Sequence, residues 1–194
     1  MQPPADIDPK ELERQALNVN PGGWTVQNTR PIATLLGSCV AVCLFDPGTR
    51  LAGMNHFLLP SRTKAADDDP DVILAGDYSM EVLLNAMLNK GVNRRRIVAK
   101  AFGGGTIVTS IQMAIGERNS RFAADWLERE GIPLVASDFG GAWSRKVIFD
   151  PLSGDVFCRR MPTNQDTVRT LIQEEQAYAN SLIKPAQSKR VELF

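Results

Sequence analysis

The stretch that decides the fold is IATLLGSCVAVCLF, residues 32–45. Two apolar runs, 32–36 and 40–45, have the length and the aliphatic, partly β-branched composition of buried strands. Between them, Gly37-Ser38 interrupts the apolar pattern directly before a cysteine, and glycine lets a backbone turn tightly. The sequence therefore predicts two strands joined by a short turn, with the sulfur of Cys39 at the end of a strand.

Strand and helix patterns alternate outward from this stretch. A third apolar run at 51–59 predicts a strand that continues a meander with the first two. Further strands are predicted at 96–102, 134–137, 145–150 and 156–160, and helices at 78–89, 119–130 and 166–183. This order predicts an α/β (α+β) fold, a layered sandwich of mixed β-sheet and helices.

The composition indicates one principal domain. The chain has 194 residues, a length that suits a single core. Residues 1–23 are polar and rich in proline, which predicts a flexible N-terminal arm with little chemistry. The domain itself is expected at 24–162, followed by a C-terminal helix and polar tail at 163–194.

Charge and hydropathy exclude several classes of partner. Lys and Arg number 22 and Asp and Glu also number 22, so no net charge attracts nucleic acid. The apolar runs are far shorter than the ~18 residues of a membrane-spanning helix, and the N-terminus lacks the pattern of a signal peptide. We therefore expect a cytoplasmic protein that does not insert into the membrane, in which all three cysteines are thiols.

Cys39 is the candidate nucleophile. Acyl transfer by a thiol requires a base for its proton and hydrogen-bond donors for the oxyanion. The chain has a single histidine, His56, on the next predicted strand, and a turn at 46–51 would make the two strands antiparallel neighbours. Register decides whether the two side chains share a face. The sequence predicts that His56 is the base for Cys39.

Glycine-rich turns are the candidate oxyanion and substrate-binding elements. Backbone N–H groups around Gly37 and Ser38 lie next to the predicted nucleophile. Gly103-Gly104-Gly105 follows a predicted strand but lacks the GxxxxGK[ST] pattern and lysine of a phosphate-binding loop. Gly103 and Gly104 therefore form either a turn that lines a substrate cleft or a simple connection.

Other interpretations of the same residues stay open. A lone cysteine beside an apolar strand is more often a small core residue than a nucleophile, and a lone histidine is more often structural than catalytic. Cys43 would share a strand face with Cys39, so a metal or redox site of Cys39, Cys43 and His56 is conceivable. The short CxxC pairs and fourth ligand of a zinc site are absent.

Five blocks of the sequence carry a family resemblance: 34–43, 53–60, 101–104, 115–119 and 138–141. With these blocks the chain resembles the chemoreceptor glutamine deamidase family, CheD, over about residues 25–162. The resemblance implies a cytosolic α/β domain, similar to bacterial toxin deamidases, that converts glutamines of methyl-accepting chemoreceptors to glutamates. It implies Cys39 as nucleophile, His56 as base and an upstream threonine, for which Thr34 is the candidate, as the third member of a triad.

Two consequences of the resemblance can be stated as expectations. The reaction proceeds through a thioester and requires no metal or organic cofactor. The alternative function is that of a non-catalytic adaptor, because the CheD family also includes proteins that bind and regulate a CheC-type phosphatase of the response regulator.

Overall fold

The computed structural model describes residues 8–59, 70–106, 109–161 and 165–183. Its elements, in chain order, are α1 (Pro9–Gln15), β1 (Leu17–Asn18), β2 (Trp24–Gln27), β3 (Ile32–Leu36), β4 (Val40–Asp46), β5 (Leu51–Asn55), α2 (Pro70–Leu88), a 3-10 turn (Arg94–Arg96), β6 (Val98–Gly103), α3 (Thr109–Arg129), β7 (Leu134–Phe139), β8 (Ser144–Phe149), β9 (Val156–Met161) and α4 (Gln165–Ile183).

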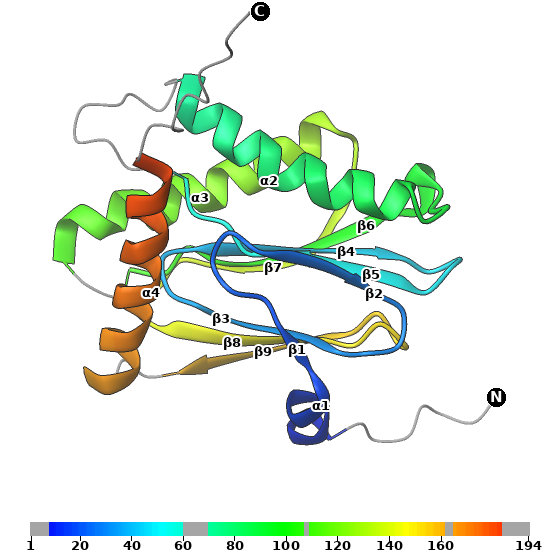
Figure 1. Ribbon diagram of the computed structural model, residues 1–194, viewed down its shortest axis with the longest axis horizontal. Helices are drawn as coiled ribbons and strands as arrows, with labels where there is room; N and C mark the ends of the chain where they lie inside the picture. The colour runs from blue at the N-terminus through cyan, green and yellow to red at the C-terminus, as the bar shows by residue number, and fades with distance from the viewer. Residues whose placement is uncertain (1–7, 60–69, 107–108, 162–164, 184–194) are drawn as a thin grey trace, which may run out of the picture.

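Two stacked β-sheets form the centre of the fold. One has the strand order β1-β3-β8-β9 and the other β2-β5-β4-β6-β7. Helices α2 and α3 cover the outer face of the five-stranded sheet, and α4 stands across one end of both sheets (Figure 1). The predicted layered sandwich of mixed sheet and helices is thereby confirmed.

Strand β4 lies at the centre because both of its faces are apolar. Val40, Val42 and Leu44 pack against the helices, whereas Cys39, at the entry to the strand, and Ala41 pack against the second sheet. A strand buried on both faces reads as a continuous apolar run rather than an alternating one. The run that marked 40–45 in the sequence thus reflects this double burial.

The predicted meander of three consecutive strands is wrong in one respect. β4 pairs antiparallel with β5 on one edge and with β6 on the other, so neither edge is left for β3. β3 pairs instead with β8 in the other sheet. The Gly37-Ser38 turn consequently carries the chain from one sheet to the other.

Part of the predicted N-terminal arm belongs to the fold. The short strand β1 pairs in parallel with β3, with Leu17 opposite Ile32, and Val19 is buried in the core between the sheets. A two-residue strand is too short to give a periodic signal, which is why the sequence pattern missed it. Residues 1–7 of the arm lie outside the described residues.

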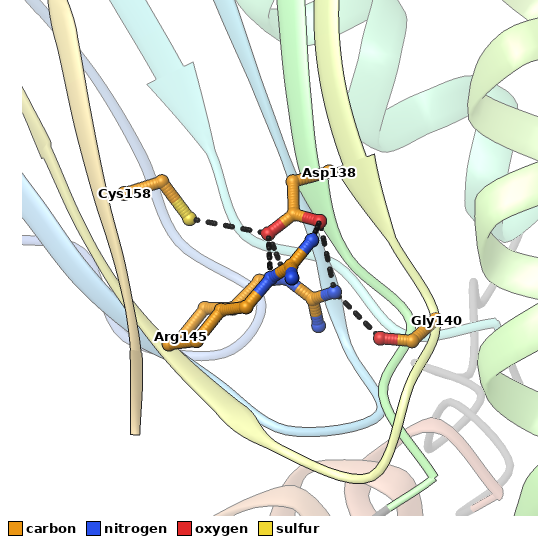
Figure 2. Close-up of polar contacts among 5 residues, drawn as sticks. Asp138, Gly140, Arg145 and Cys158 are labelled. Carbon is orange, nitrogen blue, oxygen red and sulfur yellow. Dashed lines mark hydrogen bonds and ion pairs between the residues drawn. The ribbon is translucent and has the colours of Figure 1, made fainter.

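A carboxylate ties the two sheets together at the outer strand β7. Asp138 accepts hydrogen bonds from Arg145 Nε on β8 at 3.0 Å and from Arg160 Nη2 on β9 at 2.6 Å. Figure 2 shows Asp138 with Arg145 and with the Cys158 thiol, which points toward the same carboxylate. Hydrogen bonds from Arg160 and then Arg145 hold the pKa of Asp138 well below its ordinary value. The ion pairs of Asp138 with Arg145 and Arg160 connect β7 to the four-stranded sheet.

Candidate active site

Cys39 and His56 share one face of the five-stranded sheet. The antiparallel pairing continues past the end of β5 to Phe57, which exchanges backbone hydrogen bonds of 3.0 and 2.8 Å with Val40, the first residue of β4. Followed along the register, His56 lies opposite Ala41, one position inside the Val40–Phe57 pair. Cys39 and His56 are therefore diagonal neighbours on one face of the sheet. Both side chains face the second sheet. The His56 ring does not hydrogen-bond the Cys39 sulfur in this structure: Nδ1 contacts Thr34 and the Val19 carbonyl, and Nε2 has no partner among the described residues.

Thr34 reaches His56 from that second sheet. The Thr34 hydroxyl donates to the Val19 carbonyl at 2.7 Å and lies 2.8 Å from His56 Nδ1. A hydroxyl has one proton, and a carbonyl can only accept, so the Thr34 oxygen must accept the second bond from His56 Nδ1–H. This assignment of the tautomer follows from the hydrogen-bond network. It leaves His56 Nε2 unprotonated.

The environment of His56 keeps it neutral. The ring is 1% exposed, and burial lowers the pKa of His56 to about 4. Among the described residues Nε2 has no hydrogen-bond partner, so its lone pair is available. One oriented nitrogen and one free nitrogen give the imidazole the geometry of a proton acceptor. Its lowered pKa makes it a weak base while the site stays buried.

The turn that precedes Cys39 forms a binding site for an oxygen ligand. The backbone N–H groups of Gly37 and Cys39 donate to the same oxygen, Glu175 Oε1, at 3.2 and 3.1 Å. The Ser38 hydroxyl donates to the other oxygen, Oε2, at 2.5 Å. Two converging N–H groups beside a nucleophile have the arrangement that stabilises the oxyanion of an acyl-transfer intermediate. Of the predicted donor residues, Gly37 contributes its N–H and Ser38 its hydroxyl rather than its N–H; their role as oxyanion donors stays a prediction.

Glu175 is the site residue that the sequence did not reveal. It lies on α4, 136 positions after Cys39. Leu171, Glu175, Tyr178 and Ala179 follow the i, i+4, i+7, i+8 spacing of one helix face, and the structure turns this face toward the domain. An acidic residue inside an otherwise apolar stripe was the signal that could have indicated its role.

Gly103 and Gly104 contact the backbone carbonyl of Cys39. Gly104 N–H donates to the Cys39 carbonyl at 2.8 Å, and Gly105 N–H donates to the Gly37 carbonyl at 2.8 Å. These bonds hold the backbone of the turn and already engage the two N–H groups. A direct role of Gly103 and Gly104 in substrate binding remains a prediction.

Asn119 of α3 joins the turn to the segment after His56. Its side-chain amide donates to the Ser38 carbonyl at 2.9 Å, and its side-chain oxygen accepts from Leu59 N–H at 3.0 Å. Asn119 is completely buried. One amide side chain therefore fixes the backbone on both sides of the site.

The three cysteines differ from the pattern of a metal or redox centre. Burial, and then the charge of Glu175, raise the pKa of Cys39 well above its ordinary value. Burial likewise raises the pKa of Cys43 far above that of an exposed thiol, which makes it unreactive. Among the described residues no three His, Cys, Asp or Glu side chains gather as metal ligands.

Comparison with known proteins gives the family. Residues 58–160 match the family described as "CheD chemotactic sensory transduction". The chain is 54% identical over 189 residues to a protein of Dechloromonas aromatica named "Probable chemoreceptor glutamine deamidase CheD 2", covering 95% of this chain and 96% of that protein. This chain belongs to the CheD family.

Other relatives have similar names and coverage. A protein of Burkholderia thailandensis with the same name is 40% identical, over 90% of each chain. "Probable chemoreceptor glutamine deamidase CheD" of Vibrio vulnificus is also 40% identical, over 92% of this chain and 86% of that protein. The family match at 58–160 begins after both Cys39 and His56, so the roles of these two residues depend on the geometry described above. Among the described helices, none has the length and hydropathy needed to cross a bilayer.

Proposed function

We propose that this chain deamidates glutamine side chains of chemoreceptors in the cytoplasm, with Cys39 as nucleophile and His56 as general base. The observation that carries the proposal is the geometry around Cys39. His56 Nδ1 is held by Thr34 and its free Nε2 belongs to a ring on the same sheet face as Cys39, while backbone N–H groups at Gly37 and Cys39 bind one oxygen. The names of the CheD relatives supply the substrate class.

The reaction follows from these groups. His56 Nε2 takes the Cys39 proton as the sulfur attacks the glutamine amide carbon. The amide oxygen becomes an oxyanion, to which the N–H groups of Gly37 and Cys39 donate. The C–N bond then breaks, and ammonia leaves with the proton from His56. Water, deprotonated by the same imidazole, hydrolyses the thioester and yields glutamate and free thiol.

A mass-spectrometric assay tests this function. We expect wild-type protein to add about 1 Da, the Gln-to-Glu difference, to peptides of a purified chemoreceptor fragment, and Cys39→Ala and His56→Ala to abolish the conversion. Cys43→Ala is the matched control, because it removes a buried thiol on the same strand and should preserve conversion. Conversion by the Cys39→Ala protein would refute the mechanism. If neither the wild-type protein nor any variant converts a folded receptor fragment, the adaptor function, with a CheC-type phosphatase as partner, becomes the better explanation.

Thr34 is the proposed positioning residue for His56, and a Thr34→Val variant tests this role. Valine has a similar shape but no hydroxyl, so His56 Nδ1 loses its 2.8 Å acceptor and retains only the longer contact, 3.4 Å, with the Val19 carbonyl. We expect kcat to fall by about 10- to 100-fold, the range seen when an orienting partner of a functional histidine is removed, with little change in KM. Thr34→Ser retains the hydroxyl and should restore most of kcat. Equal loss in both variants would indicate a packing defect instead.

A further inference from the structure

The carboxylate of Glu175 occupies the place that the proposed reaction reserves for substrate. The residue is 8% exposed, and burying an ionised carboxylate is unfavourable unless donors surround it. Gly37 N–H, Cys39 N–H and the Ser38 hydroxyl supply those donors. The same N–H groups are the proposed oxyanion donors. A glutamate side chain bound there has the chemical identity of the reaction product.

The rest of α4 closes the site around this carboxylate. Tyr178 lies against the backbone of Gly22, where any side chain larger than hydrogen would meet its ring, and Gly22 N–H donates to the His56 carbonyl at 2.8 Å. Tyr178 and Ala179 also pack on the core that contains Cys39. Cys39 and His56 are 0% and 1% exposed. The helix, which stands across one end of the sandwich (Figure 1), therefore covers Cys39 directly. It reaches His56 only through the Gly22 backbone.

We propose that α4 is an intramolecular product mimic: Glu175 binds the oxyanion donors at Cys39, blocks the site, and must withdraw before a substrate enters. The term product mimic rests on the proposed deamidase function. The blocking of the site by Glu175 does not depend on that function. The negative charge of Glu175 beside Cys39 further disfavours the thiolate, so the Cys39 thiol is unreactive in the closed state.

Thiol reactivity measures the closure without reference to deamidation. Iodoacetamide should label Cys39 about 10-fold or more faster in Glu175→Ala than in wild type or in Glu175→Gln, because labelling scales with the fraction of molecules whose site is open. Glu175→Gln removes the same charge beside the thiol but retains the shape of the side chain, so it separates opening from the loss of charge. Gln176→Ala is the matched control: it shortens the neighbouring, exposed side chain on the other side of residue 175 in α4 and should leave the labelling rate unchanged. Peptide mass spectrometry separates Cys39 from Cys43 and Cys158. Equal rates in wild type and Glu175→Ala would overturn the proposal.

A second variant tests the mimicry and retains the shape of the side chain. Glu175→Gln places an amide where the structure has the product carboxylate. Cys39 should attack the carbon of this introduced amide, the C–N bond should break with loss of ammonia, and water should hydrolyse the thioester, so that the chain converts its own residue 175 back to glutamate. The expected signal is a gain of about 1 Da in the peptide containing residue 175, absent when Cys39→Ala is combined with it.

The two readouts separate failure of the closure from failure of the proposed function. Faster labelling in Glu175→Ala, with the introduced amide at position 175 and the receptor glutamines all left unconverted, would retain the closure and refute the deamidase. Receptor conversion without faster labelling would retain the deamidase and refute the closure. Receptor conversion and faster labelling together, but with the amide of Glu175→Gln unchanged, would overturn the product mimic, since α4 would then cover the site without placing residue 175 in it.

Discussion

An Asp138→Ala variant is expected to lose about 3 kcal/mol of unfolding free energy, the low end of the range for removing one partner of a buried ion pair, because Arg145 is fully buried whereas the Asp138 side chain is 20% exposed. The reason is Arg145, whose side chain is fully buried against Asp138 (Figure 2). Without the carboxylate, a guanidinium would remain in the core with the Gly140 carbonyl as an acceptor but without the counter-charge of Asp138. Urea denaturation followed by tryptophan fluorescence measures the difference.

Arg160→Ala is the matched control for this prediction. Arg160 binds the same carboxylate, but its side chain is 57% exposed, and an ion pair open to solvent contributes little to stability. The variant also removes the contact of the Arg160 guanidinium with the Trp143 ring, 4.7 Å from its centroid. A large loss for Asp138→Ala with a small one for Arg160→Ala would assign the stabilisation to the buried pair. Similar small losses in both would mean that the junction between β7 and the second sheet depends on packing alone.

The local half of the site could be predicted from the sequence. Gly37-Ser38 marked the turn before Cys39, and the strands that carry Cys39 and His56 were expected to be antiparallel neighbours. Both statements depend on residues close together in the chain, where apolar runs and turn residues are informative. The register, which the pattern alone left open, places both side chains toward the second sheet.

The long-range half could not be predicted in the same way. Apolar runs identify strands but not their partners, so β3 was assigned to the sheet of β4, although it pairs with β8. Crossing to the other sheet is what allows Thr34 to face His56 across the core. Val19 and Glu175 lie in segments that appeared peripheral, yet Val19 fixes the Thr34 hydroxyl and Glu175 fills the oxygen site. Periodicity could mark Glu175 as an acidic residue within an apolar helix face, but it could not indicate which distant turn the carboxylate contacts.

Gly103→Ala is expected to damage stability and activity together. Gly103 has a φ angle of +121°, which residues with a Cβ rarely adopt. A Cβ at this position would clash with the Cys39 carbonyl oxygen. Backbone strain of about 1–2 kcal/mol and overpacking of about 1–3 kcal/mol predict a loss of about 2–5 kcal/mol in unfolding free energy. A shift of Cys39 by about 1 Å would lower kcat by about 100-fold.

Gly91→Ala isolates the backbone contribution to this effect. Gly91 also has positive φ, +84°, but nothing lies within 4 Å of a Cβ built on it, so only the conformational penalty of about 1–2 kcal/mol applies and kcat should stay at the wild-type value. The comparison is made at a temperature where both variants are folded, with kcat from the receptor assay and stability from urea denaturation. If Gly103→Ala retained wild-type kcat, the turn at Cys39 would tolerate displacement, and rigid placement of the thiol by the glycine turn behind it would not be a requirement of the reaction.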